Sequence, residues 1–231
     1  MFIIIIISLY IGIGFSMDRT RRTVKYIFFD VGYTLVDESV VWEQRCNAQS
    51  LTDEAKALGF TPQMIYNEIV QATVAFKPQY RTVMNKYGFT QQAPYCYELE
   101  KLYGDTEHVL QKLSEKYTLG IIANQADGLS ERLKAWGIDG YFSTVISSWD
   151  YTFMKPDIRL FQAAVSQSGC RADETVMVGD RLDNDVYPAK SIGMGTVWIK
   201  QGFGGMQSPK TEEYEPDVEI NSLSELLILF L

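Results

Sequence analysis

Short apolar runs alternate with segments of helical periodicity from Val24 onward, and this alternation limits the fold more than any other feature of the sequence. The runs lie at residues 24–29, 119–123, 144–147, 175–178, 196–199 and 218–220. Helical spacing is found at residues 106–117, 127–136 and 157–168, and a capping box from Ser222 to Glu225 predicts the start of a last helix. The pattern predicts a doubly wound α/β fold, with a mostly parallel sheet covered by helices on both faces.

Residues 38–104 interrupt this alternation, because their apolar residues recur mostly at helical spacings and no convincing strand is present. We expect an all-helical domain inserted after the first strand, with hinges near residues 37–40 and 102–106. The α/β core then consists of residues 24–37 and 105–231.

Charge and residue counts exclude several kinds of function. The chain has 21 Lys and Arg residues against 29 Asp and Glu residues, a net charge of −8, and so lacks the general attraction for nucleic acid. Its one histidine, His108, rules out a metal site built from several histidines. Cys46, Cys96 and Cys170 form no CxxC pair and are expected to be reduced. Nothing in the sequence indicates an oligomeric state.

The apolar segment at residues 2–15 admits three interpretations. It is shorter than the roughly 18 residues of a membrane span, and basic residues follow it rather than precede it. Residues 1–16 are either an upstream extension before a true start at Met17, a membrane anchor, or a cleaved signal. The first two place the body of the protein in the cytoplasm, by the positive-inside rule in the case of the anchor. We expect a cytoplasmic body, with a membrane partner only if residues 2–15 act as an anchor.

Polar residues follow the predicted strands at the points where a parallel sheet collects ligands. They are Asp30, Asn124, Lys155, Asp180 and Asp185. Any one of them has an ordinary explanation as a turn or capping residue. Because all five follow successive strands, we expect them to meet at one edge of the sheet.

This set of side chains suits phosphoryl transfer. Mg²⁺ prefers carboxylates, water and phosphate oxygens, so Asp30 and Asp180 would hold it, with Asp185 assisting through water. Lys155 would neutralise charge in the transition state. Asp30 would attack phosphorus and form an aspartyl-phosphate.

Four motifs in this order resemble those of the haloacid dehalogenase-like hydrolase superfamily, in a member with an inserted helical cap. They are FFDVGYTL at residues 28–35, LGIIANQ at 119–125, MKPD at 154–157 and MVGDRLDND at 177–185. The resemblance extends from Lys25 to the end of the chain. It implies a Rossmann-like core and Mg²⁺-dependent hydrolysis of a small phosphorylated metabolite.

The resemblance also implies roles for single residues. Asp30 is the nucleophile and a metal ligand, and the main-chain carbonyl of Gly32 is a second ligand. Asp180 and Asp185 complete the metal site. Lys155 orients the nucleophile and the phosphate, while Asn124 lies beside the phosphate.

Two positions depart from the family pattern. Phosphatases of the family carry an acid/base aspartate where this chain has Gly32, and the loss of such a group costs about 10²–10⁴ in rate. They carry a phosphate-binding Ser or Thr where this chain has Ala123, which removes a hydrogen-bond donor worth roughly 1 kcal/mol. We therefore expect a preference for good leaving groups such as acyl or aryl phosphates. Gly32→Asp should raise the hydrolysis of phosphomonoesters if only the acid is missing, and no gain would mean that another group fills the role or that the site is not a phosphatase.

Two alternatives follow from the same residues. The first is a protein that binds a phosphorylated ligand with weak or no catalysis. The second is a dehalogenase that cleaves carbon–halogen bonds, against which the acidic pair Asp180 and Asp185 argues.

The aromatic residues of the insertion are expected to form mainly its core rather than a substrate pocket. They are Trp42, Tyr66, Phe76, Tyr80, Tyr87, Phe89 and Tyr95. Arg45, Lys77 and Arg81 are candidates for binding an anionic substrate.

Overall fold

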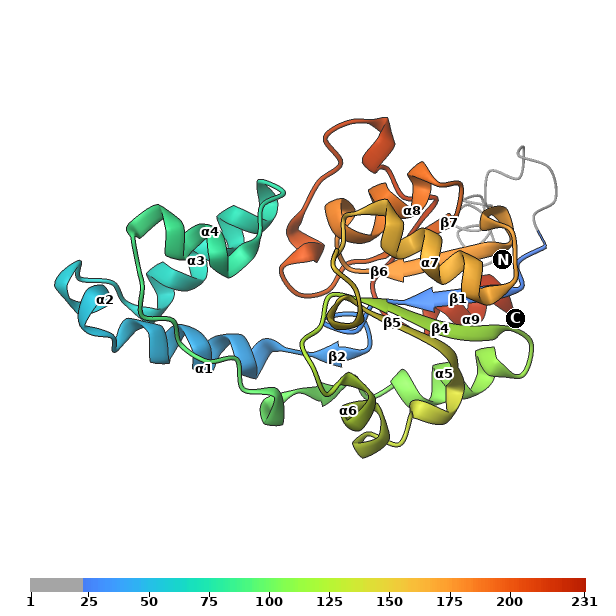
Figure 1. Cartoon of the computed structure of the whole chain (residues 1–231), viewed down its shortest axis with the longest axis horizontal. Helices are drawn as coiled ribbons and strands as arrows, with labels where there is room; N and C mark the ends of the chain where they lie inside the picture. The colour runs from blue at the N-terminus through green and yellow to red at the C-terminus, as the bar shows by residue number, and fades with distance from the viewer. Residues whose placement is uncertain (1–22) are drawn as a thin grey trace, which may run out of the picture.

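A six-stranded parallel sheet forms the centre of the protein, whose computed structural model describes residues 23–231 (Figure 1). The interpretations of residues 1–16 lie outside this range. The strands are β1 (Tyr26–Phe29), β4 (Thr118–Ala123), β5 (Phe142–Ser147), β6 (Thr175–Gly179), β7 (Gly195–Ile199) and β8 (Val218–Ile220), in the order β5-β4-β1-β6-β7-β8. All neighbouring pairs are parallel, which confirms the predicted fold class.

Helices cover both faces of this sheet because the side chains of each strand alternate between two apolar cores. Ile27 and Phe29 of β1 pack with α5 (Thr106–Ser114), α6 (Leu129–Ala135) and α9 (Glu225–Phe230). Tyr26 and Phe28 pack on the opposite face with α7 (Ile158–Ser168) and α8 (Tyr187–Ser191). Strands buried on both faces must be apolar throughout, which is why the six runs stand out in the sequence.

Four α-helices lie between β2 (Val36–Asp37) and β3 (Lys101–Leu102) in the sequence and extend away from the sheet in Figure 1. They are α1 (Ser39–Ser50), α2 (Asp53–Ala57), α3 (Pro62–Val74) and α4 (Gln79–Tyr87). Their buried apolar side chains form a separate cluster that includes Trp42, Ile65 and Tyr80. Tyr33 and Phe203, which belong to loops at the edge of the sheet, join this cluster and so connect the helices to the core.

A pair of two-residue strands connects the helical segment to the core. β2 (Val36–Asp37) and β3 (Lys101–Leu102) are antiparallel neighbours. Gly88, with a φ of 69°, ends α4, and the chain then returns to the core without a further α-helix. The sequence predicts neither strand, because a strand of two residues is too short to produce a visible periodicity, and β3 lies within residues 38–104, which are expected to be all-helical.

Several element ends differ from the sequence-based expectations. The last helix begins at Glu225 rather than at Ser222. The Glu225 carboxylate accepts hydrogen bonds from the backbone N–H groups of Asn221 and Ser222, so it stabilises a turn that precedes the helix. In addition, α5 ends at Ser114 rather than at Tyr117, and β1 begins at Tyr26 rather than at Val24. Within residues 23–231, no helix has the length and apolar character that crossing a membrane requires.

Gly120 on β4 lies against the stacked rings of Tyr26 and Phe28, whose centroids are 4.4 Å apart. A Cβ atom at position 120 would lie 2.8 Å from a carbon of each ring. We expect Gly120→Ala to lower the free energy of unfolding by about 1–3 kcal/mol, the usual cost of overpacking a core. Urea denaturation measures this change.

Gly140→Ala is the matched control, because a Cβ atom there meets nothing within 4 Å. An equal effect of the two substitutions would contradict the described packing of β4 against β1.

Candidate active site

The polar residues predicted to converge do meet, at the carboxyl end of the sheet. The chain runs from β1 to β4 on one side and later to β6 on the other, so β1 lies at the point where the strand order reverses. A cavity of about 370 Å³ opens at this edge. Its lining includes Asp30, Gly32, Asn124, Lys155 and Asp180.

Asp30 follows β1 directly, and its backbone N–H donates to the carbonyl oxygen of Val178 on β6 at 2.9 Å. The next residues turn sharply, since the carbonyl oxygen of Val31 accepts hydrogen bonds from the backbone of Thr34, Leu35 and Val36. The sheet and this turn together hold the Asp30 carboxylate at the floor of the cavity, where 14% of its side chain is exposed.

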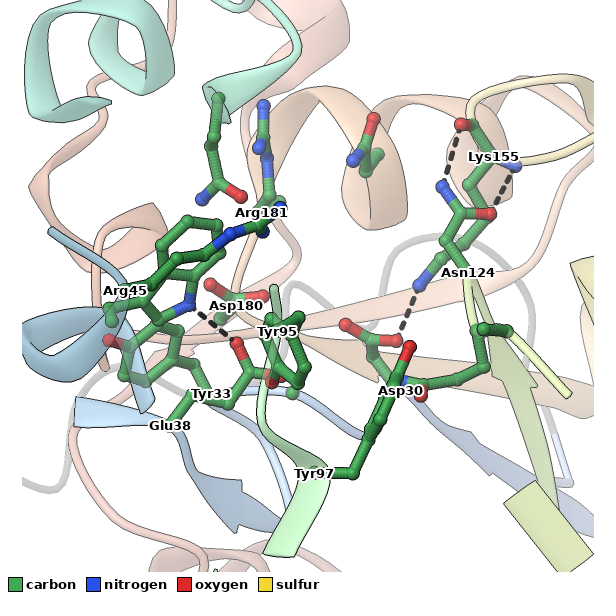
Figure 2. Close-up of a pocket in the computed structure, with 16 residues that line it drawn as sticks. Asp30, Tyr33, Glu38, Arg45, Tyr95, Tyr97, Asn124, Lys155, Asp180 and Arg181 are labelled. Atoms are coloured by element: carbon green, nitrogen blue, oxygen red, sulfur yellow. Dashed lines mark hydrogen bonds and ion pairs between the residues drawn. The ribbon is translucent and has the colours of Figure 1, made fainter. Parts of the chain in front are cut away.

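Lys155 provides the positive charge of the site. Its Nζ atom lies 2.7 Å from Oδ1 of Asp30 and 2.6 Å from Oδ1 of Asp185, and only 2% of its side chain is exposed. Figure 2 shows this side chain reaching Asp30 from above. Burial lowers the pKa of Lys155, but the attraction of Asp185 and Asp30 outweighs this effect and raises the pKa overall. The amine is therefore protonated at neutral pH.

Asn124 fixes the position of Lys155. Its side-chain amide donates to the carbonyl oxygen of Lys155 at 2.9 Å, and its Oδ1 atom accepts from the backbone N–H of Lys155 at 2.7 Å. Asn124 lines the cavity, as does the neighbouring Gln125. Ala123, by contrast, is fully buried as the last residue of β4.

Three carboxylates lie close enough to share a cation. Ligand atoms of Asp30, Asp180 and Asp185 all lie within 4.8 Å of one another. Burial, together with the charges of Asp185 and Asp30, raises the pKa of Asp180 well above its usual value. Burial also raises the pKa of Asp185 to about 6, even though Lys155 opposes the shift.

These carboxylates fit a divalent metal ion. Within the described part of the chain, the Asp180 carboxyl group accepts no hydrogen bond, so a buried polar group is left without a partner. The ammonium of Lys155 binds Asp30 and Asp185, and Asp180 forms no ion pair within residues 23–231. Oxygen ligands in this arrangement are those that a hard divalent cation prefers.

Gly32 lies next to Asp30 in the cavity, and the space beside it is filled by Glu38. A Cβ atom on Gly32 would lie only 2.8 Å from the carboxyl carbon of Glu38. Nε1 of Trp42 donates to Oε2 of Glu38 at 2.9 Å. Burial raises the pKa of Glu38 to about 7, against the opposing effect of the hydrogen bond from Trp42.

The helical insertion supplies the outer wall of the cavity. Trp42 and Arg45 come from α1, while Tyr95 and Tyr97 come from the segment that returns to the core. The Arg45 guanidinium lies 3.6 Å above the ring of Tyr80, and its Nε donates to the carbonyl oxygen of Ala93.

The other aromatic residues singled out in the insertion do not line the cavity. Tyr66, Tyr80, Tyr87 and Phe89 belong to the apolar cluster of the insertion, and Phe76 packs against Val186 and Trp198 of the core. Lys77 and Arg81, the two other candidate cations, do not line the cavity.

Sequence reasoning missed two charged residues of the cavity, Glu38 and Arg181. Arg181 is buried, and its guanidinium forms an ion pair with Asp183 at 2.6 Å. In the segment RLDND at residues 181–185, an arginine lies two positions before an aspartate, and this spacing is the sequence signal for the ion pair. For Glu38 the available signal is Trp42, four residues further along the same helical face.

Comparisons with known proteins agree with the fold. The family model of haloacid dehalogenase-like hydrolases matches residues 27–199. A glyceraldehyde 3-phosphate phosphatase of Methanocaldococcus jannaschii is 32% identical over 221 residues, which cover 88% of this chain and 96% of that protein. A phosphoserine phosphatase of Thermus thermophilus is 31% identical over 129 residues, which cover 55% of this chain and 50% of that protein.

A solved structure matches over nearly the same range. The crystal structure of a HAD phosphatase from Thermococcus onnurineus has a TM-score of 0.62 and 27% sequence identity, and the match covers 90% of this chain and 98% of that one. Both the family model and the full-length relative span the strands that carry Asp30, Lys155 and Asp180. The chain therefore belongs to the haloacid dehalogenase-like hydrolase family.

Proposed function

We propose that this protein is a Mg²⁺-dependent phosphatase that hydrolyses small phosphorylated metabolites through an aspartyl-phosphate on Asp30. The observation that carries the proposal is the buried contact of Lys155 with Asp30 and Asp185, beside the uncompensated carboxylate of Asp180. The ammonium of Lys155 and the three carboxylates lie together at the carboxyl end of the sheet. This arrangement suits a reaction in which the site binds an anionic phosphate and one carboxylate attacks its phosphorus atom.

In this proposal the chain holds both reactants in place. Lys155 binds Oδ1 of Asp30, and Oδ2 is left to attack phosphorus. The residues that would hold Mg²⁺ are Asp30 and Asp180, with Asp185 acting through water and Gly32 through its main-chain carbonyl. The bound ion supplies positive charge that reduces the repulsion between the carboxylate and the phosphate.

The phosphate itself would lie beside Lys155. Asn124 keeps the lysine in position through its two hydrogen bonds to the main chain of that residue. Position 123 offers no side-chain hydroxyl, so the phosphate there would depend on backbone N–H groups and on Lys155.

The size of the cavity and the names of the relatives support a small substrate. A volume of about 370 Å³ accommodates a metabolite rather than a polymer. The relatives named above are phosphatases of glyceraldehyde 3-phosphate and of phosphoserine. Each of these substrates is a phosphate monoester on a short carbon chain.

A panel of phosphate esters, assayed with and without Mg²⁺, tests the proposal. We expect turnover of at least one small monoester that stops when EDTA removes the metal. Binding of a phosphate analogue with no turnover of any ester would favour a phosphate-binding protein, the alternative suggested by Gly32 and Ala123. Halide release from a haloacid without Mg²⁺ would instead favour a dehalogenase.

Mg²⁺ binding is expected to raise the thermal stability of the protein. A ligand that binds only the folded state stabilises it by about 2.7 kcal/mol at roughly 100 times its Kd. Asp180→Asn should abolish this stabilisation. Without metal, the same variant should be more stable than the wild type, because it removes a buried carboxyl group that lies close to two others.

Differential scanning calorimetry with increasing Mg²⁺ measures both effects. Asp53→Asn, at an exposed position in the first turn of α2, is the matched control and should respond to Mg²⁺ as the wild type does. A full Mg²⁺ response in Asp180→Asn would contradict the proposed metal site.

A further inference from the structure

The carboxyl group of Glu38 occupies the place that a side chain at position 32 would take. A Cβ atom built on Gly32 would lie 2.8 Å from Cδ and 3.3 Å from Oε2 of Glu38, with Oε1 closer still. The two residues are six positions apart in the sequence. The turn after Asp30 and the short strand β2 bring the chain back toward the end of β1. Glu38 therefore faces Gly32, two positions after the proposed nucleophile Asp30.

Contacts with the insertion hold this carboxyl in a defined orientation. Nε1 of Trp42, one turn along α1, donates to Oε2 at 2.9 Å, and this contact leaves Oε1 on the side of Gly32. Tyr95, in the segment that returns to the core, also lines the cavity, and its hydroxyl donates to Oε1 of Glu100 at 3.0 Å. Figure 2 shows Glu38 between Tyr33 and Tyr95, pointing into the cavity that also contains Asp30 and Asp180.

Glu38 is separate from the acidic cluster of the site. The carboxylates that approach one another closely enough to share a cation, within residues 23–231, are those of Asp30, Asp180 and Asp185. Lys155 contacts two of these carboxylates, and no lysine or arginine of the described chain forms an ion pair with Glu38. Glu38 is thus a carboxyl group that lines the cavity and takes part neither in the acidic cluster nor in an ion pair of the described residues.

We propose that Glu38 is the general acid and base of the reaction and replaces the carboxyl side chain that is missing at Gly32. This inference rests on the proposed function, because it needs a phosphate ester bound against Asp30. It assigns a catalytic role to a residue at the start of the helical insertion, outside the four motifs of the core.

The proposed reaction has two steps, transfer of the phosphoryl group to Asp30 and its hydrolysis by water. Oδ2 of Asp30 forms a bond to phosphorus while the bond from phosphorus to the ester oxygen breaks. That oxygen takes the proton of the Glu38 carboxyl and leaves as an alcohol. A water molecule then attacks phosphorus and gives a proton to the Glu38 carboxylate. The bond from phosphorus to Asp30 breaks, which releases phosphate and restores both side chains.

This proposal replaces the expected preference for good leaving groups with a specific dependence on Glu38. The wild type should hydrolyse both an alkyl phosphate, such as glyceraldehyde 3-phosphate, and the aryl phosphate p-nitrophenyl phosphate. In Glu38→Gln, which keeps an acceptor for Trp42, kcat/KM for the alkyl phosphate should fall about 10²–10⁴-fold. For p-nitrophenyl phosphate, kcat/KM should change far less, because p-nitrophenolate leaves without a proton.

A second measurement separates proton transfer from a structural role. In Glu38→Gln no carboxylate is present to take the proton from the water that attacks the aspartyl-phosphate, so this second step should be slow. The reaction with p-nitrophenyl phosphate should therefore show a burst of one p-nitrophenolate per enzyme, followed by slow turnover. Glu43→Gln, at an exposed position of α1, is the matched control and should behave as the wild type in both assays. Equal losses on both substrates without a burst would overturn the proposal, as would unchanged activity.

An exchange of the two positions provides the second variant. Gly32→Asp alone should not raise activity, because the new side chain collides with Glu38. In Gly32→Asp combined with Glu38→Ala, the collision is removed, and alkyl phosphatase activity should return at least tenfold relative to Glu38→Ala. No recovery in a folded double variant would contradict the shared position of the two carboxyl groups.

Asp30→Asn and Glu38→Gln separate the proposed function from the role of Glu38. If Asp30→Asn retains the activity, or if the wild type hydrolyses no phosphate ester, the proposed function is wrong and the role of Glu38 falls with it. If Asp30→Asn is inactive while Glu38→Gln equals the wild type on both substrates, only the role of Glu38 is wrong.

Discussion

Asp30→Asn should abolish Mg²⁺-dependent hydrolysis, with a loss in kcat of at least about 10⁴-fold, the scale seen when a catalytic nucleophile is removed. The amide has nearly the shape of the carboxylate, so the hydrogen bond from the Asp30 backbone to Val178 and the turn after β1 should persist. What is lost is the charged oxygen that would attack phosphorus. The ion pair with Lys155 is lost as well.

This result is measured by steady-state kinetics on the best ester of the panel. Circular dichroism shows whether the variant is folded, and Asp53→Asn, with its exposed carboxylate, is the matched control. Activity of Asp30→Asn within tenfold of the wild type would mean that another group attacks the substrate.

Lys155→Met should have the largest effect on stability. The substitution removes the ammonium that contacts Asp30 and Asp185, and it leaves buried carboxylates without a counter-charge. Breaking a buried ion pair by removing one partner costs about 3–5 kcal/mol of the free energy of unfolding. We also expect kcat to fall about 10²–10³-fold, because charge that develops in the transition state is no longer neutralised.

Lys25→Met is the matched control for this experiment. Lys25 pairs with Glu174 at 2.7 Å, but 56% of its side chain is exposed, and exposed pairs contribute at most about 1 kcal/mol. Urea denaturation without metal compares the two variants. If both variants lose a similarly small free energy of unfolding, the contacts of Lys155 with Asp30 and Asp185 do not form the buried ion pair that their geometry indicates.

The positions of the site residues could be predicted because they depend on strand ends. Each of Asp30, Asn124 and Asp180 directly follows an apolar strand, and parallel strands end at the same edge of a sheet. The prediction therefore needed only the strands and their direction, and both are visible in the pattern of apolar residues.

The role of Glu38 could not be predicted in this way. Its place beside Gly32 depends on a turn in which Tyr33 adopts a left-handed φ of 51°, followed by a strand of only two residues. Neither feature leaves a periodic signal in the sequence. The two hydrogen bonds between Asn124 and Lys155 could not be predicted from the sequence either, because they join residues that lie 31 positions apart.

The helix that begins at Glu225 shows a different limit. The spacing of Ser222 and Glu225 fits a capping box, and the Glu225 carboxylate does bind the backbone N–H of Ser222. The same carboxylate also binds the N–H of Asn221, and the intervening residues form a turn instead of the first turn of the helix. A local motif thus identified the contact but not the element boundary.

The covalent intermediate on Asp30 is the most direct test of the account. Glu38→Gln mixed with p-nitrophenyl phosphate and Mg²⁺, quenched in acid and digested, should yield a phosphorylated peptide that contains Asp30, identified by mass spectrometry. The account predicts one phosphoryl group per enzyme on that residue and none in the Asp30→Asn/Glu38→Gln double variant. A phosphoryl group on another residue, or turnover of the wild type with no phosphorylated peptide in either protein, would contradict it.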